Sequence, residues 1–257
     1  MFKEYAKEVE VAEKIALMAG EIMLQYFDID QQVQTKEDNS SVTIADTMIN
    51  SMVIKELTKE FPEDGVIGEE ESTSEYGLGR KWFCDPIDGT EGYIWGTPTA
   101  MFSLGLVING VPTVGIVYDP FLKRLYRAVK GQGSFSNERR LSVSNKDLIN
   151  GIIAVTSRPM KIISLKYIPE LNMEGAKFAM FSGAVCKSCL VARGKFEGYV
   201  EQGVNAHDMA AVQVIVEEAG GKVTGFDGQT LDYSKRFKGA VVSNGKIHDE
   251  FLAIISR

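Results

Sequence analysis

Cysteine and histidine are scarce in this chain of 257 residues, which holds three cysteines and two histidines. A disulfide framework needs more cysteines, and a zinc site needs more than one isolated pair. Cys186 and Cys189 form a C-x-x-C pattern, but no second pair and no nearby histidine accompany it. We therefore predict that both cysteines pack on a helix and that the protein works in the reducing cytoplasm.

Long apolar runs and an excess of positive charge are also lacking. No stretch of about 18 apolar residues is found, and the N-terminus begins with charged residues instead of an apolar signal core. The formal net charge of −7 disfavours a nucleic-acid backbone as the main partner. It does not disfavour a phosphate substrate, because bound divalent cations invert the local field. The sequence thus predicts a cytoplasmic protein whose partners are neither membranes nor nucleic acids.

The hydrophobic pattern of the first half predicts two helices followed by an antiparallel sheet. Apolar or small residues recur every three or four positions over 5–26 and again over 49–61. The apolar runs 101–108 and 111–118 are joined by Asn-Gly, which favours a tight hairpin, and 124–128 continues the meander. Further short segments complete this half: a loop or hairpin over 31–41, strands at 66–67 and 82–84, and turns at 131–134 and 137–140.

The second half alternates between short strands and helices. A helix is predicted over 182–193, with Ser182 able to cap its start. The remaining predicted elements are strands at 152–156, 199–201, 223 and 240–243, and helices at 208–219 and 248–256. The chain is therefore a mixed α/β protein with helices packed on antiparallel sheets. We place its two halves at 1–140 and 141–257.

Two aspartates separated by a proline are the first candidates for chemistry. Asp85 and Asp88 follow a buried strand, and Pro86 stiffens the turn between them. Two buried carboxylates close together repel each other, and a hard cation such as Mg²⁺ removes that conflict. Solvated aspartates in a simple turn remain the alternative for this pair taken alone.

The next two residues strengthen the case for a site. Gly89 and Thr90 suit a turn entering a helix, where backbone N–H groups and the helix dipole hold a phosphate. Metal ligands and an anion cradle would then lie within six residues of each other.

Further carboxylates stand at strand ends or helix starts. Glu69 lies in the acidic run 69–71 after a predicted strand, while Asp46 and Asp208 open predicted helices. A solvated patch and favourable first-turn charges are the alternatives for these residues. Their positions favour convergence on one cleft.

Taken together, these motifs resemble those of the inositol monophosphatase family, within the lithium-sensitive, Mg²⁺-dependent phosphatase superfamily. The matching segments occur in the family's order at 42–46 (VTIAD), 68–70 (GEE), 82–90 (WFCDPIDGT), 208–211 (DMAA) and 217–221 (EEAGG). The resemblance covers nearly the whole chain. It implies a layered α-β-α-β-α sandwich with antiparallel and mixed sheets, and a phosphoric monoester hydrolase that binds two or three Mg²⁺ ions.

The resemblance also implies a role for each site residue. Glu69, Asp85 and the carbonyl of Ile87 would hold the first Mg²⁺, Asp85, Asp88 and Asp208 the second, and Glu69 would help position a third. Thr90 and Glu69 would orient the attacking water on the first metal, with Asp46 hydrogen-bonded to Thr90. The amides of Gly89 and Thr90 would bind phosphate.

The substrate is predicted less directly. His207 stands where the family usually has tryptophan, so it changes either packing or a substrate contact. Glu201 corresponds to a glutamate that binds substrate hydroxyls in inositol-specific members, which favours inositol 1-phosphate. Residues 91–95 depart from that pattern, and residues 36–38 are similar to relatives that cleave histidinol phosphate or 3′-phosphoadenosine 5′-phosphate. These two esters and fructose 1,6-bisphosphate therefore remain candidates. A non-catalytic regulator is disfavoured, because every expected metal ligand is present. The family also implies a homodimer.

Overall fold

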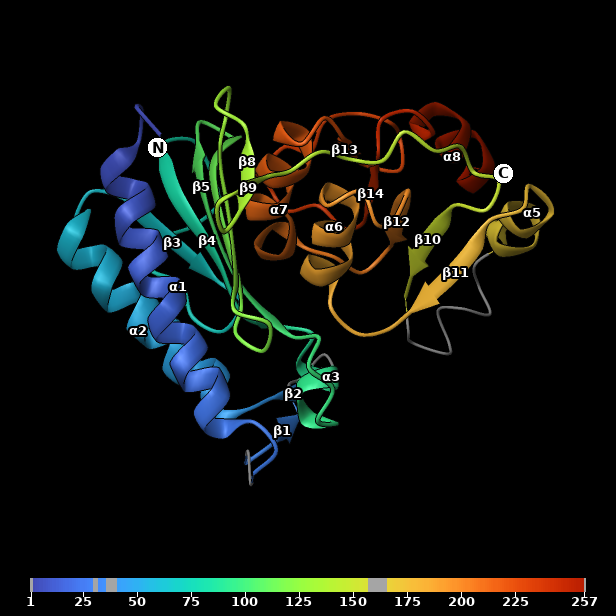
Figure 1. The fold of residues 1–257 in the computed structure, drawn as a ribbon. Coiled ribbons are helices and arrows are strands. Elements are labelled where there is room, and N and C mark those ends of the chain that lie inside the picture. The colour runs from blue at the N-terminus through green and yellow to red at the C-terminus, as the bar shows by residue number, and fades with distance from the viewer. Residues whose placement is uncertain (1, 30–31, 36–40, 157–165, 257) are drawn as a thin grey trace.

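Helices and sheets alternate in five layers along the molecule (Figure 1). The computed structural model describes residues 2–29, 32–35, 41–156 and 166–256. Within them, a pair of long helices covers a seven-stranded sheet, two central helices separate this sheet from a five-stranded one, and two short helices cover the far side. The predicted α-β-α-β-α sandwich of antiparallel and mixed sheets is confirmed.

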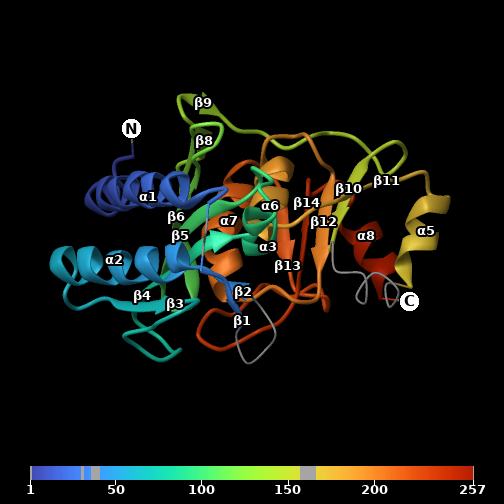
Figure 2. The same ribbon diagram turned by 90° about the horizontal axis from the view of Figure 1, so that it is seen from below.

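The first two layers are built by the N-terminal half of the chain. Helices α1 (Ala6–Tyr26) and α2 (Ile44–Glu60) lie side by side, as Figure 2 shows from below, and bury their apolar faces on the sheet. The sheet strands follow chain order: β3 (Gly65–Gly68), β4 (Arg80–Asp88), β5 (Met101–Ile108), β6 (Val111–Asp119), β7 (Arg124–Val129), β8 (Ser134–Ser136) and β9 (Arg139–Arg140). Only β3 and β4 run parallel.

Most turns of this sheet match the sequence pattern. The predicted Asn-Gly hairpin is confirmed, since Asn109 and Gly110 both have the positive φ angles it requires. The prediction of a plain turn over 137–140 is wrong in part. Arg139 and Arg140 pair with Ser136 and Phe135, so the chain makes one more short hairpin at the edge of the sheet.

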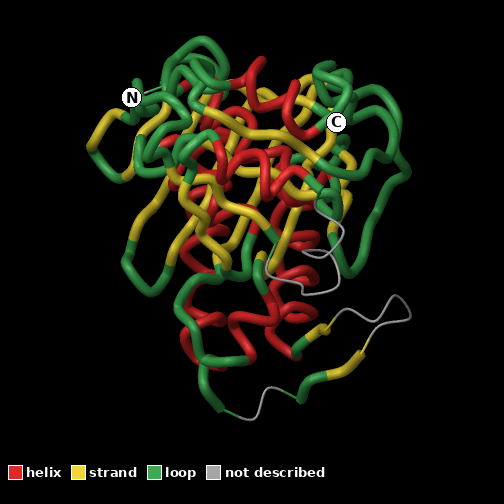
Figure 3. The backbone as a smooth tube through the Cα atoms, turned by 90° about the vertical axis from the view of Figure 1, so that its right-hand side faces the viewer, coloured by secondary structure: helices red, strands yellow, loops and turns green. Residues whose placement is uncertain are grey.

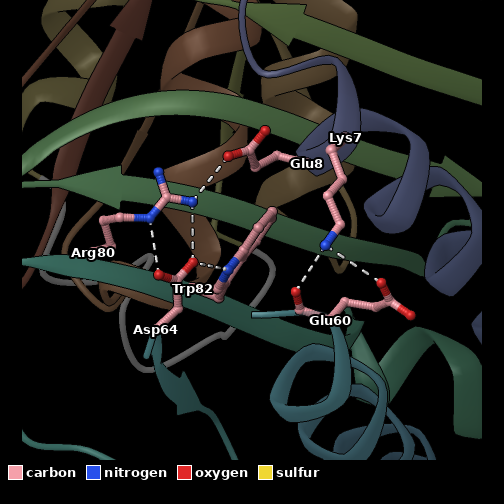
Figure 4. Close-up of polar contacts among 6 residues, drawn as sticks. All are labelled: Lys7, Glu8, Glu60, Asp64, Arg80 and Trp82. Atoms are coloured by element: carbon pink, nitrogen blue, oxygen red, sulfur yellow. Dashed lines mark hydrogen bonds and ion pairs between the residues drawn. The ribbon is translucent and has the colours of Figure 1, made fainter. Parts of the chain in front are cut away.

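A polar network fixes the start of β4 against α1 and the residues after α2 (Figure 4). The Arg80 guanidinium lies 2.8 Å from Asp64 and 3.0 Å from Glu8. The indole of Trp82 donates to the same Asp64 carboxylate at 3.0 Å. Because the Asp64 side chain is only 6% exposed and Trp82 is buried, these contacts hold the beginning of the strand whose far end carries Asp85 and Asp88.

The central layer consists of α6 (Ala184–Ala192) and α7 (Ala206–Glu218). Helix α7 packs closely on β5 and β6, where Gly105 and Gly115 leave room for its backbone. A Cβ atom at either glycine would lie within 2.6 Å of the backbone of Ala211. Cys186 and Cys189 are buried on α6, as predicted.

The last two layers come from the C-terminal half. The strand order of the five-stranded sheet is β11 (Lys177–Met180), β10 (Ile152–Val155), β12 (Gly198–Glu201), β14 (Ala240–Ser243) and β13 (Lys222–Thr224). Helices α5 (Tyr167–Met173) and α8 (His248–Ile255) lie on its outer side (Figure 1). Neither α5 nor β11 was predicted from the sequence, because both are short and only partly buried.

Two small elements complete the fold. Strands β1 (Gln34–Thr35) and β2 (Ser41–Val42) pair as an antiparallel hairpin away from both large sheets (Figure 3). The prediction for 31–41 is tested only at these strands, because residues 31 and 36–40 lie outside the described residues. Helix α3 (Thr90–Ile94) directly follows β4.

The division at residue 140 stays a prediction, because α6 and α7 of the second half pack on the sheet of the first. No helix among the described residues is long and apolar enough to cross a membrane.

Candidate active site

One pocket gathers the candidate residues from both halves of the chain. It lies where the end of β4 meets the starts of α3, α6 and α7. Nine of the residues predicted from sequence line it: Glu69, Asp85, Ile87, Asp88, Gly89, Thr90, Glu201, His207 and Asp208. Among the described lining residues Asp46 is missing, since it is buried within α2.

An irregularity in β4 aims both aspartates at this pocket. Neighbouring side chains of a regular strand alternate between its faces, so residues three apart point in opposite directions. Asp85 pairs with Ser103 and Asp88 with Met101, so three steps along β4 match two along β5. A bulge of this kind re-aims side chains, and Pro86 within it has no amide hydrogen to donate to the ladder.

Asp88 is held by the first turn of α6. Its two carboxylate oxygens accept hydrogen bonds from the amides of Ala184 at 2.9 Å and Val185 at 2.8 Å. The predicted cap by Ser182 is wrong. Gly183 occupies the cap position, and a carboxylate from another layer binds the exposed amides instead.

Gly183 is a site residue that was not predicted from the sequence. It has a φ of 103°, and a Cβ there would lie 3.0 Å from an oxygen of Asp88. Gly89, with a φ of 87°, approaches the same backbone, and its Cβ would lie 3.1 Å from the Cα of Gly183. Two glycines thus allow the end of β4 to meet the start of α6.

Asp208 lies in the first turn of α7. One of its oxygens accepts a hydrogen bond from the amide of Asn205, the residue before the helix. Helix formation therefore orients this carboxylate toward the carboxylates at the end of β4.

Among the residues that the structure describes, two clusters of possible metal ligands overlap at Asp85. Oxygens of Asp85, Asp88 and Asp208 lie within 4.8 Å of one another, and so do ligand atoms of Glu69, Asp85 and His207. Burial, then the neighbouring Glu69, raises the pKa of Asp85 well above its usual range. Burial, then the charge of Asp208, raises the pKa of Asp88 to about 7.

This donor set fits a hard divalent cation. Asp85 is 2% exposed, and its Oδ1 atom is buried with no hydrogen-bond partner. A buried carboxylate oxygen without a partner is costly, and a cation among these oxygens would satisfy it. All the donors are oxygens except the ring of His207.

Thr90 and Asp46 make contacts different from the predicted one. The Thr90 hydroxyl donates to the carbonyl of Ile87 at 3.0 Å. Asp46 instead closes the first turn of α2, where its Oδ2 atom accepts from the amide and the hydroxyl of Thr43. The predicted hydrogen bond between Asp46 and Thr90 is therefore wrong in this structure. Each side chain forms its hydrogen bonds with residues three positions before it in the chain. Burial raises the pKa of Asp46 to about 7.

A largely buried ion pair also lines the pocket. Lys187 on α6 is 1% exposed, and its ammonium lies 3.2 Å from an oxygen of Glu201 on β12. Tyr199 donates to the same oxygen at 2.9 Å. Burial opposes ionisation of Glu201, but Lys187 and Tyr199 outweigh it and lower the pKa of Glu201. Lys187 was not predicted from the sequence, although a lone cation within the apolar run 184–192 was a usable signal.

Comparison with known proteins places this fold in a defined class. The structure superposes on an IMPase from Thermotoga maritima with a TM-score of 0.88 at 28% identity, covering 97% of each chain. A histidinol-phosphatase of Mycobacterium tuberculosis is 33% identical over 237 residues, covering 87% of this chain and 88% of the relative. The Nus factor SuhB of Pasteurella multocida is 33% identical over 231 residues, covering 86% and 85%.

The sequence model of the inositol monophosphatase family matches residues 4–257. The chain belongs to the inositol monophosphatase family. It is accordingly a phosphoric monoester hydrolase, and the resemblance inferred from its motifs is confirmed.

Proposed function

We propose that this protein hydrolyses a small phosphate monoester with the help of Mg²⁺, with inositol 1-phosphate as its first candidate substrate. The observation that carries the proposal is the buried, unpartnered Oδ1 of Asp85 beside the carboxylates of Asp88 and Asp208. A phosphate dianion would be repelled by this pocket unless cations neutralised it.

We take the ligand sets from the family resemblance, and the two clusters support their carboxylate members. Glu69, Asp85 and the Ile87 carbonyl would hold one ion, and Asp85, Asp88 and Asp208 a second, with Glu69 also near a third. When bound, Mg²⁺ lowers the pKa of water and neutralises charge on the attacking and leaving oxygens. The bulge of β4 supports this assignment, since it aims Asp85 and Asp88 at one point.

The residues after the bulge would orient the reactants. The amides of Gly89 and Thr90 open α3 and would bind the phosphate. The Thr90 hydroxyl and the Glu69 carboxylate would orient the attacking water, and Glu69 would accept its proton. Asp46 would act less directly. The charge of Glu69 contributes to the raised pKa of Asp46, and the buried Oδ1 of Asp46 has no hydrogen-bond partner.

Glu201 and His207 would lie beside the alcohol part of the substrate. Glu201 supports a polyol, because an ionised carboxylate accepts hydrogen bonds from hydroxyl groups, and Lys187 and Tyr199 keep it ionised. The name histidinol-phosphatase on one relative supports histidinol phosphate as the second candidate substrate. Two more candidates are 3′-phosphoadenosine 5′-phosphate and fructose 1,6-bisphosphate.

We also propose that the protein acts in the cytoplasm as a lithium-sensitive homodimer. Three buried cysteines with free thiols support a reducing compartment. Light scattering on the purified protein tests the dimer, and adding Li⁺ to the assay tests the inhibition.

A substrate panel tests the proposed function. Phosphate release is measured from the four esters with Mg²⁺, with a chelator, and with Mg²⁺ plus Li⁺. We expect release with Mg²⁺ only, fastest from inositol 1-phosphate. Fastest release from histidinol phosphate would replace the substrate, and no release from any ester would favour a phosphatase-like regulator.

A further inference from the structure

Among the described residues of the two clusters, His207 is the only one that offers a nitrogen donor. It is the second residue of α7, and its side chain is 15% exposed. One of its ring nitrogens lies within 4.8 Å of carboxylate oxygens of both Glu69 and Asp85, which themselves lie within that distance of each other. Two ligands on opposite sides of an ion with bonds of about 2.1 Å stand about 4 Å apart, so this spacing suits one shared ion.

The ring of His207 is not held by a hydrogen bond to its neighbour on α7. Its Nε2 atom lies 3.8 Å from Oδ2 of Asp208, which is longer than a hydrogen bond. That same oxygen already accepts a hydrogen bond from the amide of Asn205. The helix therefore presents the imidazole to the pocket beside Asp85, whose buried Oδ1 has no hydrogen-bond partner.

We propose that a ring nitrogen of His207 is a direct ligand of the metal ion held by Glu69 and Asp85. This inference rests on the proposed metal site, and it replaces the substrate contact predicted for His207. A neutral imidazole among carboxylates favours later transition metals more than an all-oxygen site does. The site then accepts Mg²⁺ and Mn²⁺ but binds Co²⁺ more tightly than its carboxylates alone would.

The second histidine of the chain, His248, is not available to bind a metal ion. His248 is fully buried, and both of its ring nitrogens are engaged, one with Ser243 at 2.8 Å and the second with Thr224 at 3.0 Å. The chain contains no further histidine. A histidine nitrogen bound to a metal in this protein is therefore assigned to His207.

Pulsed electron paramagnetic resonance of the Mn²⁺-loaded protein tests the ligand directly. We expect a coupling from histidine ¹⁴N that is replaced by a ¹⁵N coupling when the protein is grown on ¹⁵N-labelled histidine. The labelled protein is unchanged in sequence, so this result does not depend on the folding of a variant. Bound Mn²⁺ without histidine nitrogen coupling would overturn the inference and leave the proposed metal site standing.

The variant His207→Gln extends the test to metal preference. Calorimetry gives the affinities of Co²⁺ and Mg²⁺ for both proteins. We expect the ratio of Co²⁺ to Mg²⁺ affinity to fall about tenfold or more in the variant, because only the nitrogen ligand is lost. An unchanged ratio would overturn the inference. Failure of the unaltered protein to bind any of these ions would overturn the proposed function as well.

Discussion

The carboxylate of Asp88 accepts a hydrogen bond at 2.9 Å from the amide of Ala184, 96 residues further along the chain. A residue of the first sheet thereby caps the first helix of the central layer. The same contact aims Asp88 at the pocket and joins the two halves of the chain there. Asp88 therefore has a structural role, at the start of α6, as well as its proposed role as a metal ligand.

Replacing Asp88 with asparagine is expected to abolish turnover and preserve the fold. Losing one metal ligand removes several kcal/mol of transition-state stabilisation, so kcat should fall about a thousandfold. One amide bond to α6 is lost, at about 1 kcal/mol, but a buried charge beside Asp208 disappears as well. Steady-state kinetics and circular dichroism check both parts. Near-normal turnover in Asp88→Asn would refute the assignment.

Asp85→Asn is expected to stabilise the metal-free protein. Burial and the nearby Glu69 disfavour a charge at Asp85, so its removal should raise the free energy of unfolding by about 1 kcal/mol or more at pH 8. Urea unfolding in the presence of a chelator measures this.

The matched measurement adds Mg²⁺. The unaltered protein should gain about 2.7 kcal/mol at a Mg²⁺ concentration one hundred times the dissociation constant. Asp85→Asn should gain much less. Equal gains for both proteins would show that Asp85 holds no metal.

The pair of Lys187 and Glu201 is expected to behave as a unit. Lys187→Met leaves the Glu201 carboxylate, whose side chain is 14% exposed, without its cation, which should cost roughly 2 kcal/mol of unfolding free energy. Adding Glu201→Gln should recover most of that loss. Lys195→Met, at an exposed lysine just after α6, is the control and should change stability by no more than about 0.5 kcal/mol. Additive losses in the double variant would mean that the pair is not coupled.

Acid should weaken the C-terminal layers through His248. Burial lowers the pKa of its imidazole from 6.5 to about 4. Between these two values the unfolded chain binds a proton that the folded protein does not, so stability falls as the pH drops from 6.5 toward 4. Unfolding midpoints across this range should fall more steeply for the unaltered protein than for His248→Gln. Parallel pH profiles would show that His248 makes no such contribution.

Local patterns were enough to predict the fold class and most of the elements. The Asn-Gly turn at 109–110 and the apolar spacing of α1 and α2 depend on neighbours in the chain, and all are confirmed. Elements with weak local signals, α5 and β11, were missed. Arg139 and Arg140 form a strand because of the hairpin they join, which their charge does not indicate.

In the site, too, features with a local sequence signal were predicted, and features that depend on distant contacts were missed. The carboxylates that line the pocket were predicted because their motifs are local, and their roles stay proposals. The cap of α6 by Asp88 was missed because its partners lie 96 and 97 residues away. Lys187 was missed for a similar reason, since its partner Glu201 lies on a strand of another layer. The bulge of β4 requires the pairing with β5, which no short motif specifies.

The dependence of phosphate release on free Mg²⁺ tests the central claim most directly. Protein stripped of metal with a chelator is titrated with Mg²⁺ while hydrolysis of inositol 1-phosphate is followed. We predict no turnover without the cation and recovery that saturates as the carboxylate pocket fills. Turnover of any ester in the panel that is equally fast with and without chelator would contradict the claim.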